Sequence, residues 1–129
     1  MRQLVLWGLV LTAGPQSFQD QVAGVWRGES ICVQRGTACA DERVVYDIRV
    51  RAEHTGFVTI RADKIVDGHA VTMGTSEWRC DPDTHTLVWE TPRQIWLIKV
   101  DGDTINGTLT LADHTLIRRV TLKRSKGGE

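Results

Sequence analysis

Residues 86–124 constrain the fold most, because apolar and polar side chains alternate along them between turns rich in Asp and Gly. Alternation with a period of two predicts antiparallel strands that each bury one face. Turns fall at Asp101–Asp103 and at Asp113–His114, and short turns of this composition join neighbouring strands. We therefore expect four consecutive strands in this segment, each paired with the next.

The preceding residues continue the pattern, and no segment of adequate length repeats its apolar residues with the period of a helix. Four further strands are expected, at Gly24–Val33, Arg43–Arg51, Phe57–Ile65 and Val71–Cys80. Eight sequential strands favour an all-β, antiparallel up-and-down (meander) barrel, because closure gives the first and last strands a partner. An open β-sandwich is the alternative. In a barrel, the first strand must pair with the last, Leu116–Arg124.

A chain of 129 residues has room for one domain. Arg2, then an apolar run over residues 4–11, then small residues follow one another in the order of a secretory signal peptide. The run is too short to span a bilayer, and an ordinary first strand is the alternative. We expect a signal peptide and connector over 1–23, the barrel over 24–124 and a disordered tail over 125–129. The protein is then secreted or periplasmic, with no membrane span in its mature form.

Cys32 and Cys39 flank a loop that contains Gly and Thr, so a local disulfide is geometrically easy and fits an oxidising compartment. Cys80 is then left as a buried free thiol. A zinc site needs closely spaced Cys or His residues, and no such pair exists, so we expect no metal.

The charge is balanced, with 16 basic and 16 acidic residues, and leaves no electrostatic footprint for nucleic acid. Nothing resembles a Ser-His-Asp or Cys-His arrangement, because the histidines lie in or beside separate turns. We therefore expect no catalysis and no cofactor, and we expect a monomer.

Polar residues of inward parity are candidates for a binding site, because a buried polar group needs a partner. Tyr46 lies among apolar residues of one expected strand and Arg118 among those of another. Arg118 has the geometry to anchor a ligand carboxylate or phosphate. The alternative is an internal ion pair, with Glu77 as a candidate partner. Ser30 is expected to face Arg118 where the first and last strands meet.

The tryptophans Trp78, Trp89 and Trp96 are also candidates, because an indole combines a large apolar surface with one polar group. Filling of the core is the alternative. The spacing does not decide which of Trp89 and Trp96 points inward.

The opening Gly24-Val25-Trp26, the eight-strand pattern, the long first loop and a basic residue on the last strand resemble the lipocalins and the wider calycin group. The resemblance implies an extracellular barrel that closes one end with the tryptophan and carries a small hydrophobic ligand through the other. It also implies Gly24 and Trp26 as the structural signature, with Arg124 (or Arg118) as its basic partner.

Two functions are therefore open. The first is a secreted lipocalin-like barrel that binds a small hydrophobic or amphipathic ligand in its lumen, without catalysis, through Tyr46, Trp78, Trp89, Trp96 and Arg118. The second is a protein-interaction or inhibitor module of the cell envelope that acts through the loops of its open end, above all residues 34–42.

Overall fold

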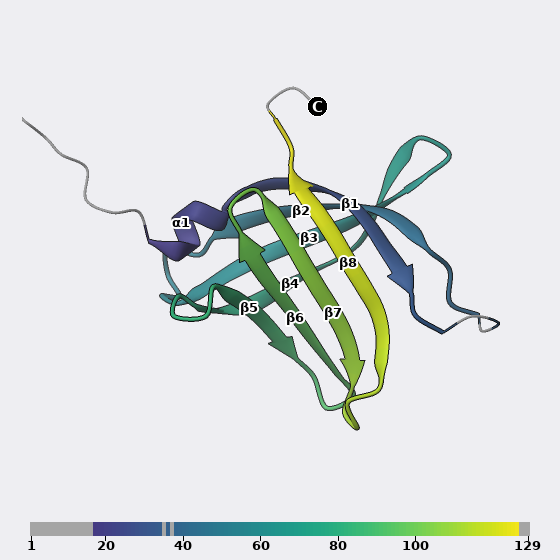
Figure 1. Cartoon of the computed structure of the whole chain (residues 1–129). Helices are drawn as coiled ribbons and strands as arrows, with labels where there is room; N and C mark the ends of the chain where they lie inside the picture. Colours follow the sequence, from purple (N-terminus) through teal and green to yellow (C-terminus); the bar gives the residue numbers. More distant parts are fainter. Residues whose placement is uncertain (1–16, 35, 37, 127–129) are drawn as a thin grey trace, which may run out of the picture.

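The computed structural model describes residues 17–34, 36 and 38–126. Eight antiparallel strands follow one another in sequence order around a closed up-and-down barrel, as the sequence predicts (Figure 1). The strands are β1 (Gly24–Cys32), β2 (Glu42–Val50), β3 (Phe57–Val66), β4 (His69–Asp81), β5 (Thr86–Glu90), β6 (Gln94–Asp101), β7 (Thr104–Leu111) and β8 (Leu116–Arg124). A short helix, α1 (Phe18–Val22), precedes β1.

The seam between β1 and β8 closes the barrel. Residues 26–32 of β1 pair with residues 118–124 of β8, so the open β-sandwich is excluded. The two strands approach closely at Gly28, where a Cβ atom would lie 1.9 Å from the carbonyl oxygen of Thr121. Only glycine leaves room for this approach, so Gly28 is a requirement of the closure.

Alternate residues of the strands fill the barrel, as period-two patterning requires. On β2, the side chains of Val44, Tyr46 and Ile48 are all buried, in agreement with the predicted face. Val50 has the same parity but is exposed, because it lies at the end of the strand. The inward side chains of the other strands join the same core.

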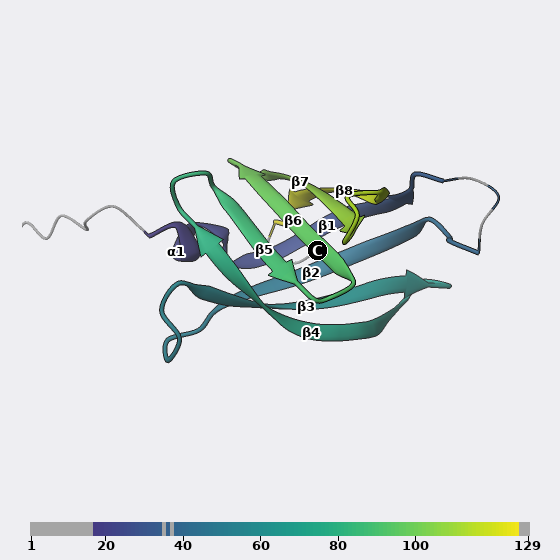
Figure 2. The ribbon, with the colours of Figure 1, turned by 90° about the horizontal axis from the view of Figure 1, so that it is seen from below.

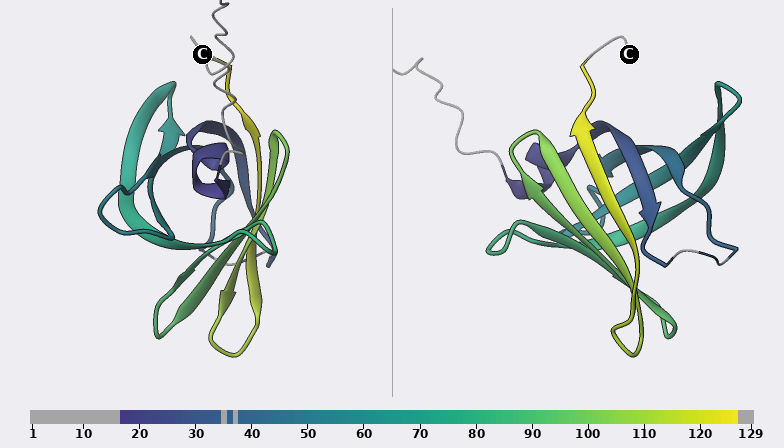
Figure 3. Two further views of the ribbon diagram at one scale, coloured as in Figure 1. Left: turned by 90° about the vertical axis from the view of Figure 1, so that its left-hand side faces the viewer. Right: turned by 45° about the vertical axis from the view of Figure 1, so that its right-hand side comes forward.

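The domain begins earlier than the sequence predicts. Residues 17–23, which we expected to form part of a connector, contain α1, and its Phe18 and Val22 belong to the hydrophobic core. The helix lies across one end of the barrel, as the end-on view of Figure 3 (left) shows. The expected boundary at Gly24 is therefore wrong. We call the end covered by α1 the closed end, and the opposite end the open end.

The carboxyl-terminal boundary also differs from the expected one. The N–H of Ser125 donates to the carbonyl oxygen of Val25 (2.8 Å), and its hydroxyl accepts from Nε of Arg27 (3.2 Å). Ser125 thus extends the pairing of the last strand and does not begin a disordered tail. Residues 127–129 of that predicted tail and residues 1–16 of the predicted signal peptide lie outside the described residues.

The wall of the barrel is weakest between β4 and β5. β4 has 13 residues, but only Arg79, Cys80 and Asp81 pair with β5. The register between β3 and β4 also shifts next to Gly74, and such a β-bulge bends a strand. The β3–β4 hairpin consequently extends away from the β5–β6 hairpin (Figure 2). On this side of the open end, no described strand pairs with β4 on its β5 side.

The predicted disulfide is present between Cys32 and Cys39, whose Cα atoms are 6.1 Å apart. It closes the long loop between β1 and β2 at the open end, and a disulfide fits an oxidising compartment. Cys80 is free and partly buried, and burial raises its pKa to about 11, so the thiol stays protonated and unreactive at neutral pH. Within the described ranges, no helix has the length and apolar character needed to cross a membrane.

A candidate ligand pocket at the open end

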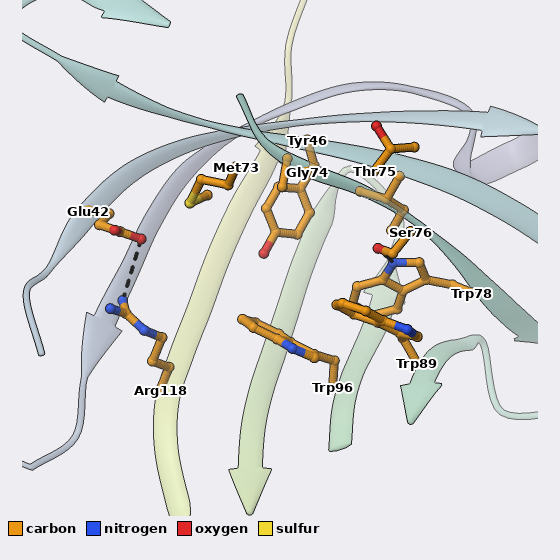
Figure 4. A pocket seen from close by; sticks show the side chains of 12 residues that line it. Glu42, Tyr46, Met73, Gly74, Thr75, Ser76, Trp78, Trp89, Trp96 and Arg118 are labelled. Atoms are coloured by element: carbon orange, nitrogen blue, oxygen red, sulfur yellow. Dashed lines mark hydrogen bonds and ion pairs between the residues drawn. The ribbon is translucent and has the colours of Figure 1, made fainter. Parts of the chain in front are cut away.

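A pocket of about 260 Å³ lies inside the open end, where β4 diverges from β5 and β6 (Figure 4). All five residues that the sequence predicts for a ligand site line it. The complete lining is Glu42, Tyr46, Ile60, Ala62, Met73, Gly74, Thr75, Ser76, Trp78, Trp89, Trp96 and Arg118. The structure therefore brings the predicted residues together from five strands, while their binding of a ligand stays a prediction.

Three indole rings form one wall of this pocket. The centroid of the Trp78 ring lies 5.9 Å from that of Trp89 and 6.3 Å from that of Trp96. Trp89 and Trp96 are directly paired across β5 and β6, so they lie on the same face of the sheet, and both line the pocket. Trp78 is held in place by its indole N–H, which donates to the hydroxyl of Ser76 (2.7 Å). The rings of Trp89 and Trp96 are tilted by 43° and 58° against that of Trp78, so the wall is aromatic but not flat.

Tyr46 reaches the pocket from β2, on the side opposite the tryptophans. Its side chain is only 4 % exposed, and its hydroxyl points toward the part of the pocket between Trp96 and Arg118 (Figure 4). Burial raises the pKa of Tyr46 to about 12, although the positive charge of Arg118 opposes the shift. No hydrogen bond joins this hydroxyl to another group in the described part of the chain, and its oxygen is not among the buried side-chain atoms that lack a partner there, so it is accessible from the pocket.

Arg118 is held by several partners at the rim of the pocket. Its Nη1 donates to the hydroxyl of Ser30 (3.0 Å), as expected, and to the Ser30 carbonyl oxygen (3.3 Å). Its Nη2 donates to the carbonyl oxygen of Ala40 (2.9 Å). Nη1 also lies 3.7 Å from Oε1 of Glu42, and the two side chains are 14 % and 23 % exposed. The guanidinium is therefore fixed and largely neutralised within the protein.

The internal ion pair of Arg118 differs from the one considered in the sequence, where Glu77 is wrong as the partner. Glu77 instead contacts Arg51 (3.1 Å) and His54 (3.0 Å) on the outer surface. It follows the inward Ser76 and precedes the inward Trp78, so its side chain points outward, because successive residues of a strand face opposite sides. Parity alone was sufficient to exclude it.

Sequence reasoning missed Glu42 and Met73 as pocket residues. Glu42 is the first residue of β2 and has the parity of Val44, which was the available signal. Met73 has no such signal, because it falls at the register shift where Gly74 and Thr72 pair with consecutive residues of β3. A bulge reverses the parity of the residues that follow it, and a single sequence does not reveal the bulge.

The closed end contains the arrangement that the lipocalin resemblance implies. Trp26 is fully buried, and its indole N–H donates to the carbonyl oxygen of Val22 in α1 (3.0 Å). The guanidinium carbon of Arg124 lies 4.3 Å from the centroid of the Trp26 ring, which is cation–π distance. Arg124, and not Arg118, is therefore the basic partner of Trp26. Gly24 lies beside them with a φ of +138°, and a Cβ there would be 3.1 Å from Nη1 of Arg124.

The remaining bonds of Arg124 tie the closed end together. Its Nη1 and Nη2 donate to the carbonyl oxygens of Ala23 (3.1 Å) and Gln21 (2.6 Å), and its Nε donates to Asp103 (2.9 Å). One guanidinium thus joins α1, the β6–β7 turn and β8.

Apart from the Glu42–Arg118 ion pair, the pocket is lined by uncharged groups, so its chemistry is that of stacking, apolar contact and hydrogen bonding. In the part of the chain that the structure describes, no three His, Cys, Asp or Glu residues gather closely enough to hold a metal ion. Comparison of the chain with models of known protein families and with curated proteins finds no match, so its function has to be inferred from the geometry of this pocket.

Proposed function

We propose that the protein binds a small hydrophobic or amphipathic ligand in the open-end pocket, without catalysis. The observation that carries this proposal is the pairing of a wall of three indoles with the hydroxyl of Tyr46, which opens on the pocket and has no hydrogen-bond partner among the described residues. Ligand pockets are typically apolar and contain a few polar groups that fix orientation. The volume of about 260 Å³ lies just below the range of about 300–1,000 Å³ that is usual for such sites. The ligand is therefore small, or one end of it extends out of the pocket where β4 is not paired with β5.

Export and kinship with the lipocalins belong to the same proposal. The Arg124–Trp26 contact, with Gly24 beside it, supports the kinship. The Cys32–Cys39 disulfide supports a secreted or periplasmic protein, because such bonds persist in oxidising compartments.

Tryptophan fluorescence provides the test, because Trp89 and Trp96 line the pocket and are only partly buried. Titration with alkanols, fatty acids and aromatic compounds is expected to change the emission in a saturable way. Ala62 lies in the pocket, and Ala62→Leu is expected to abolish the change by filling the space. Ala70→Leu is the matched control, because Ala70 is exposed and outside the pocket. A panel that produces no saturable change with the unmodified protein would contradict the proposal.

Binding of another protein through the open end is the second candidate. Val66 and Val71 are 43 % and 44 % exposed near the tip of the β3–β4 hairpin, and exposed apolar side chains that lie together mark interaction surfaces. The double variant Val66→Ser, Val71→Ser tests this function. A partner that is retained by the unmodified protein and released by this variant, with small-ligand binding unchanged in both, would favour the second candidate.

A further inference from the structure

We infer that the ligand of the open-end pocket is an uncharged compound with a flat aromatic ring and a hydrogen-bond acceptor oxygen, and not a fatty acid or another ion. This inference rests on the proposed function of the pocket. It follows from three properties of the lining: its charge, its shape and its unpaired hydrogen-bonding groups.

The charge of the lining is already balanced. Glu42 and Arg118 carry its only formal charges at neutral pH, and they lie 3.7 Å apart. The guanidinium of Arg118 also donates to Ser30 and Ala40. A ligand carboxylate would have to displace Glu42 from Arg118 and leave that carboxylate without its partner in a partly buried site. A cationic ligand would meet Arg118 itself. The pocket therefore supplies no compensating charge for a ligand of either sign.

The shape of the lining favours a flat ring over an alkyl chain. Trp78, Trp89 and Trp96 present one aromatic wall, and the ring of Tyr46 faces it from β2 (Figure 4). A ring placed between these surfaces gains offset-stacked or edge-to-face contacts, which an alkyl chain of equal area does not make. The small volume also accommodates a compact ring more readily than an extended chain.

The polar groups beside the aromatic wall that have no described partner can each donate a hydrogen bond. The hydroxyl of Tyr46 has no partner among the described residues, and neither do the indole N–H groups of Trp89 and Trp96. The N–H of Trp78, by contrast, is used by Ser76. An indole N–H only donates, and a tyrosine hydroxyl both donates and accepts. An acceptor oxygen on the ligand, such as a ketone, would therefore accept a hydrogen bond from the Tyr46 hydroxyl, which opens on the pocket and has no partner within the described part of the protein.

Four compounds separate the possible ligand classes by isothermal titration calorimetry. 2-Acetylnaphthalene, 2-naphthoate and 2-naphthyltrimethylammonium share a ring and differ in charge, and dodecanoate supplies an anionic alkyl chain. The neutral ketone is expected to bind about tenfold more tightly than any of the three ions, because each ion must lose hydration without gaining a counter-charge. If 2-naphthoate or dodecanoate binds as tightly as the ketone, the inference is overturned and the proposed function stands. If no compound of any charge binds, the proposed function fails as well.

The role of the Tyr46 hydroxyl is tested by Tyr46→Phe, which removes one oxygen and preserves the ring. This variant is expected to weaken 2-acetylnaphthalene binding about three- to tenfold, the effect of one lost hydrogen bond. Its affinity for 2-methylnaphthalene, which has no acceptor, should stay unchanged. An equal loss of affinity for both compounds would contradict a hydrogen bond from Tyr46 to the ligand.

The contribution of the Glu42–Arg118 pair is tested by Glu42→Gln, which leaves Arg118 without its counter-charge. We expect this variant to raise the affinity for 2-naphthoate several-fold and to leave the affinity for 2-acetylnaphthalene nearly unchanged. Asp103→Asn is the matched control, because Asp103 pairs with Arg124 at the closed end and should affect neither compound. An unchanged preference for the ketone in Glu42→Gln would overturn the assignment of ligand charge to the Glu42–Arg118 pair.

Discussion

The two ends of the barrel combine the same kinds of side chain and reach opposite results. β8 contributes Arg124, which lies over Trp26, to the closed end, and Arg118, which lines the same pocket as three tryptophans, to the open end. At the closed end, α1 covers the pair, and Trp26 and Val22 are completely buried. At the open end, no described helix lies over Arg118 and the indoles, Trp89 and Trp96 are only partly buried, and a pocket remains. The difference between the two ends is therefore the presence of α1, which covers the Trp26–Arg124 pair and excludes solvent from it.

The hydrogen bonds of the indoles show the same contrast. Trp26 donates to the backbone of α1, so its N–H is satisfied inside the protein and the ring serves the fold. Trp89 and Trp96 donate to no other described residue, and their rings are only partly buried. Trp89 and Trp96 therefore have surface and an N–H group available for new contacts, whereas Trp26 at the closed end has neither.

The largest effect is expected from removing one indole at each end. Trp26→Ala should lower the free energy of unfolding by about 3–5 kcal/mol, because it leaves a large cavity in a region that cannot collapse. Trp96→Ala should lower it by only about 1 kcal/mol, because water can enter the site. Urea denaturation followed by circular dichroism measures both values. Similar losses for the two variants would mean that the open end is as tightly packed as the closed end.

The pH dependence of stability should report the desolvation of the Tyr46 side chain. Its folded pKa is raised from 10.0 to about 12, so the folded state holds this proton more tightly than the unfolded state. The resulting stabilisation is complete below pH 10 and is lost as the pH rises toward 12, on the order of 2–3 kcal/mol. The difference in unfolding free energy between the unmodified protein and Tyr46→Phe, measured at pH 9 and pH 11.5, isolates this contribution from other groups. A pH-independent difference would show that the ionised oxygen of Tyr46 is as well solvated in the folded protein as in the unfolded chain.

The disulfide should stabilise the open end by constraining the loop that it closes. For the sequence separation of 7 residues, loop-closure entropy predicts a loss of about 2–2.5 kcal/mol in the double variant Cys32→Ala, Cys39→Ala. Ala40 lies next to this bond and accepts from Arg118, so ligand affinity should fall together with stability. A matching fall in stability with no change in ligand affinity would separate the loop from the pocket.

The smallest effect is expected from the carboxylates that pair with the two arginines. Asp103 is 83 % exposed, whereas Glu42 is 23 % exposed. Asp103→Asn should therefore change the unfolding free energy by a few tenths of a kcal/mol and Glu42→Gln by about 1 kcal/mol, because solvent screens the exposed pair. The reverse order, measured by thermal or urea unfolding, would show that the closed-end pair is the more shielded of the two.

The parts of the structure that follow from local pattern were predictable. Alternating residues between turns specified eight strands, and their even number and order placed Trp26 opposite Arg124. The inward parity of Tyr46 and Arg118 led to the pocket for the same reason. These features depend on the period of a strand and on the direction of successive strands, both of which can be read from one sequence.

The remaining parts depend on packing or register, which a local pattern does not contain. α1 has 5 residues, too few to establish a helical period, and its stability comes from burial of Phe18 and Val22. The pairing of Trp89 with Trp96 depends on the register of β5 and β6, and the inward position of Met73 depends on a bulge. Glu42 shares the parity of Val44, but its place at the end of a long loop hid that it begins β2.

The short pairing of β4 with β5 has a consequence for the behaviour of the protein in concentrated solution. Between His69 and Trp78, β4 pairs with β3 and has no pairing with β5, so a stretch of its backbone is a free edge. Such an edge is a template on which a second chain can add a strand. The irregularity at Met73–Gly74 interrupts the template near its middle, because the twist it introduces breaks the straight row of donors and acceptors. The irregularity at Met73–Gly74 therefore limits strand addition along the same unpaired part of β4 that borders the pocket.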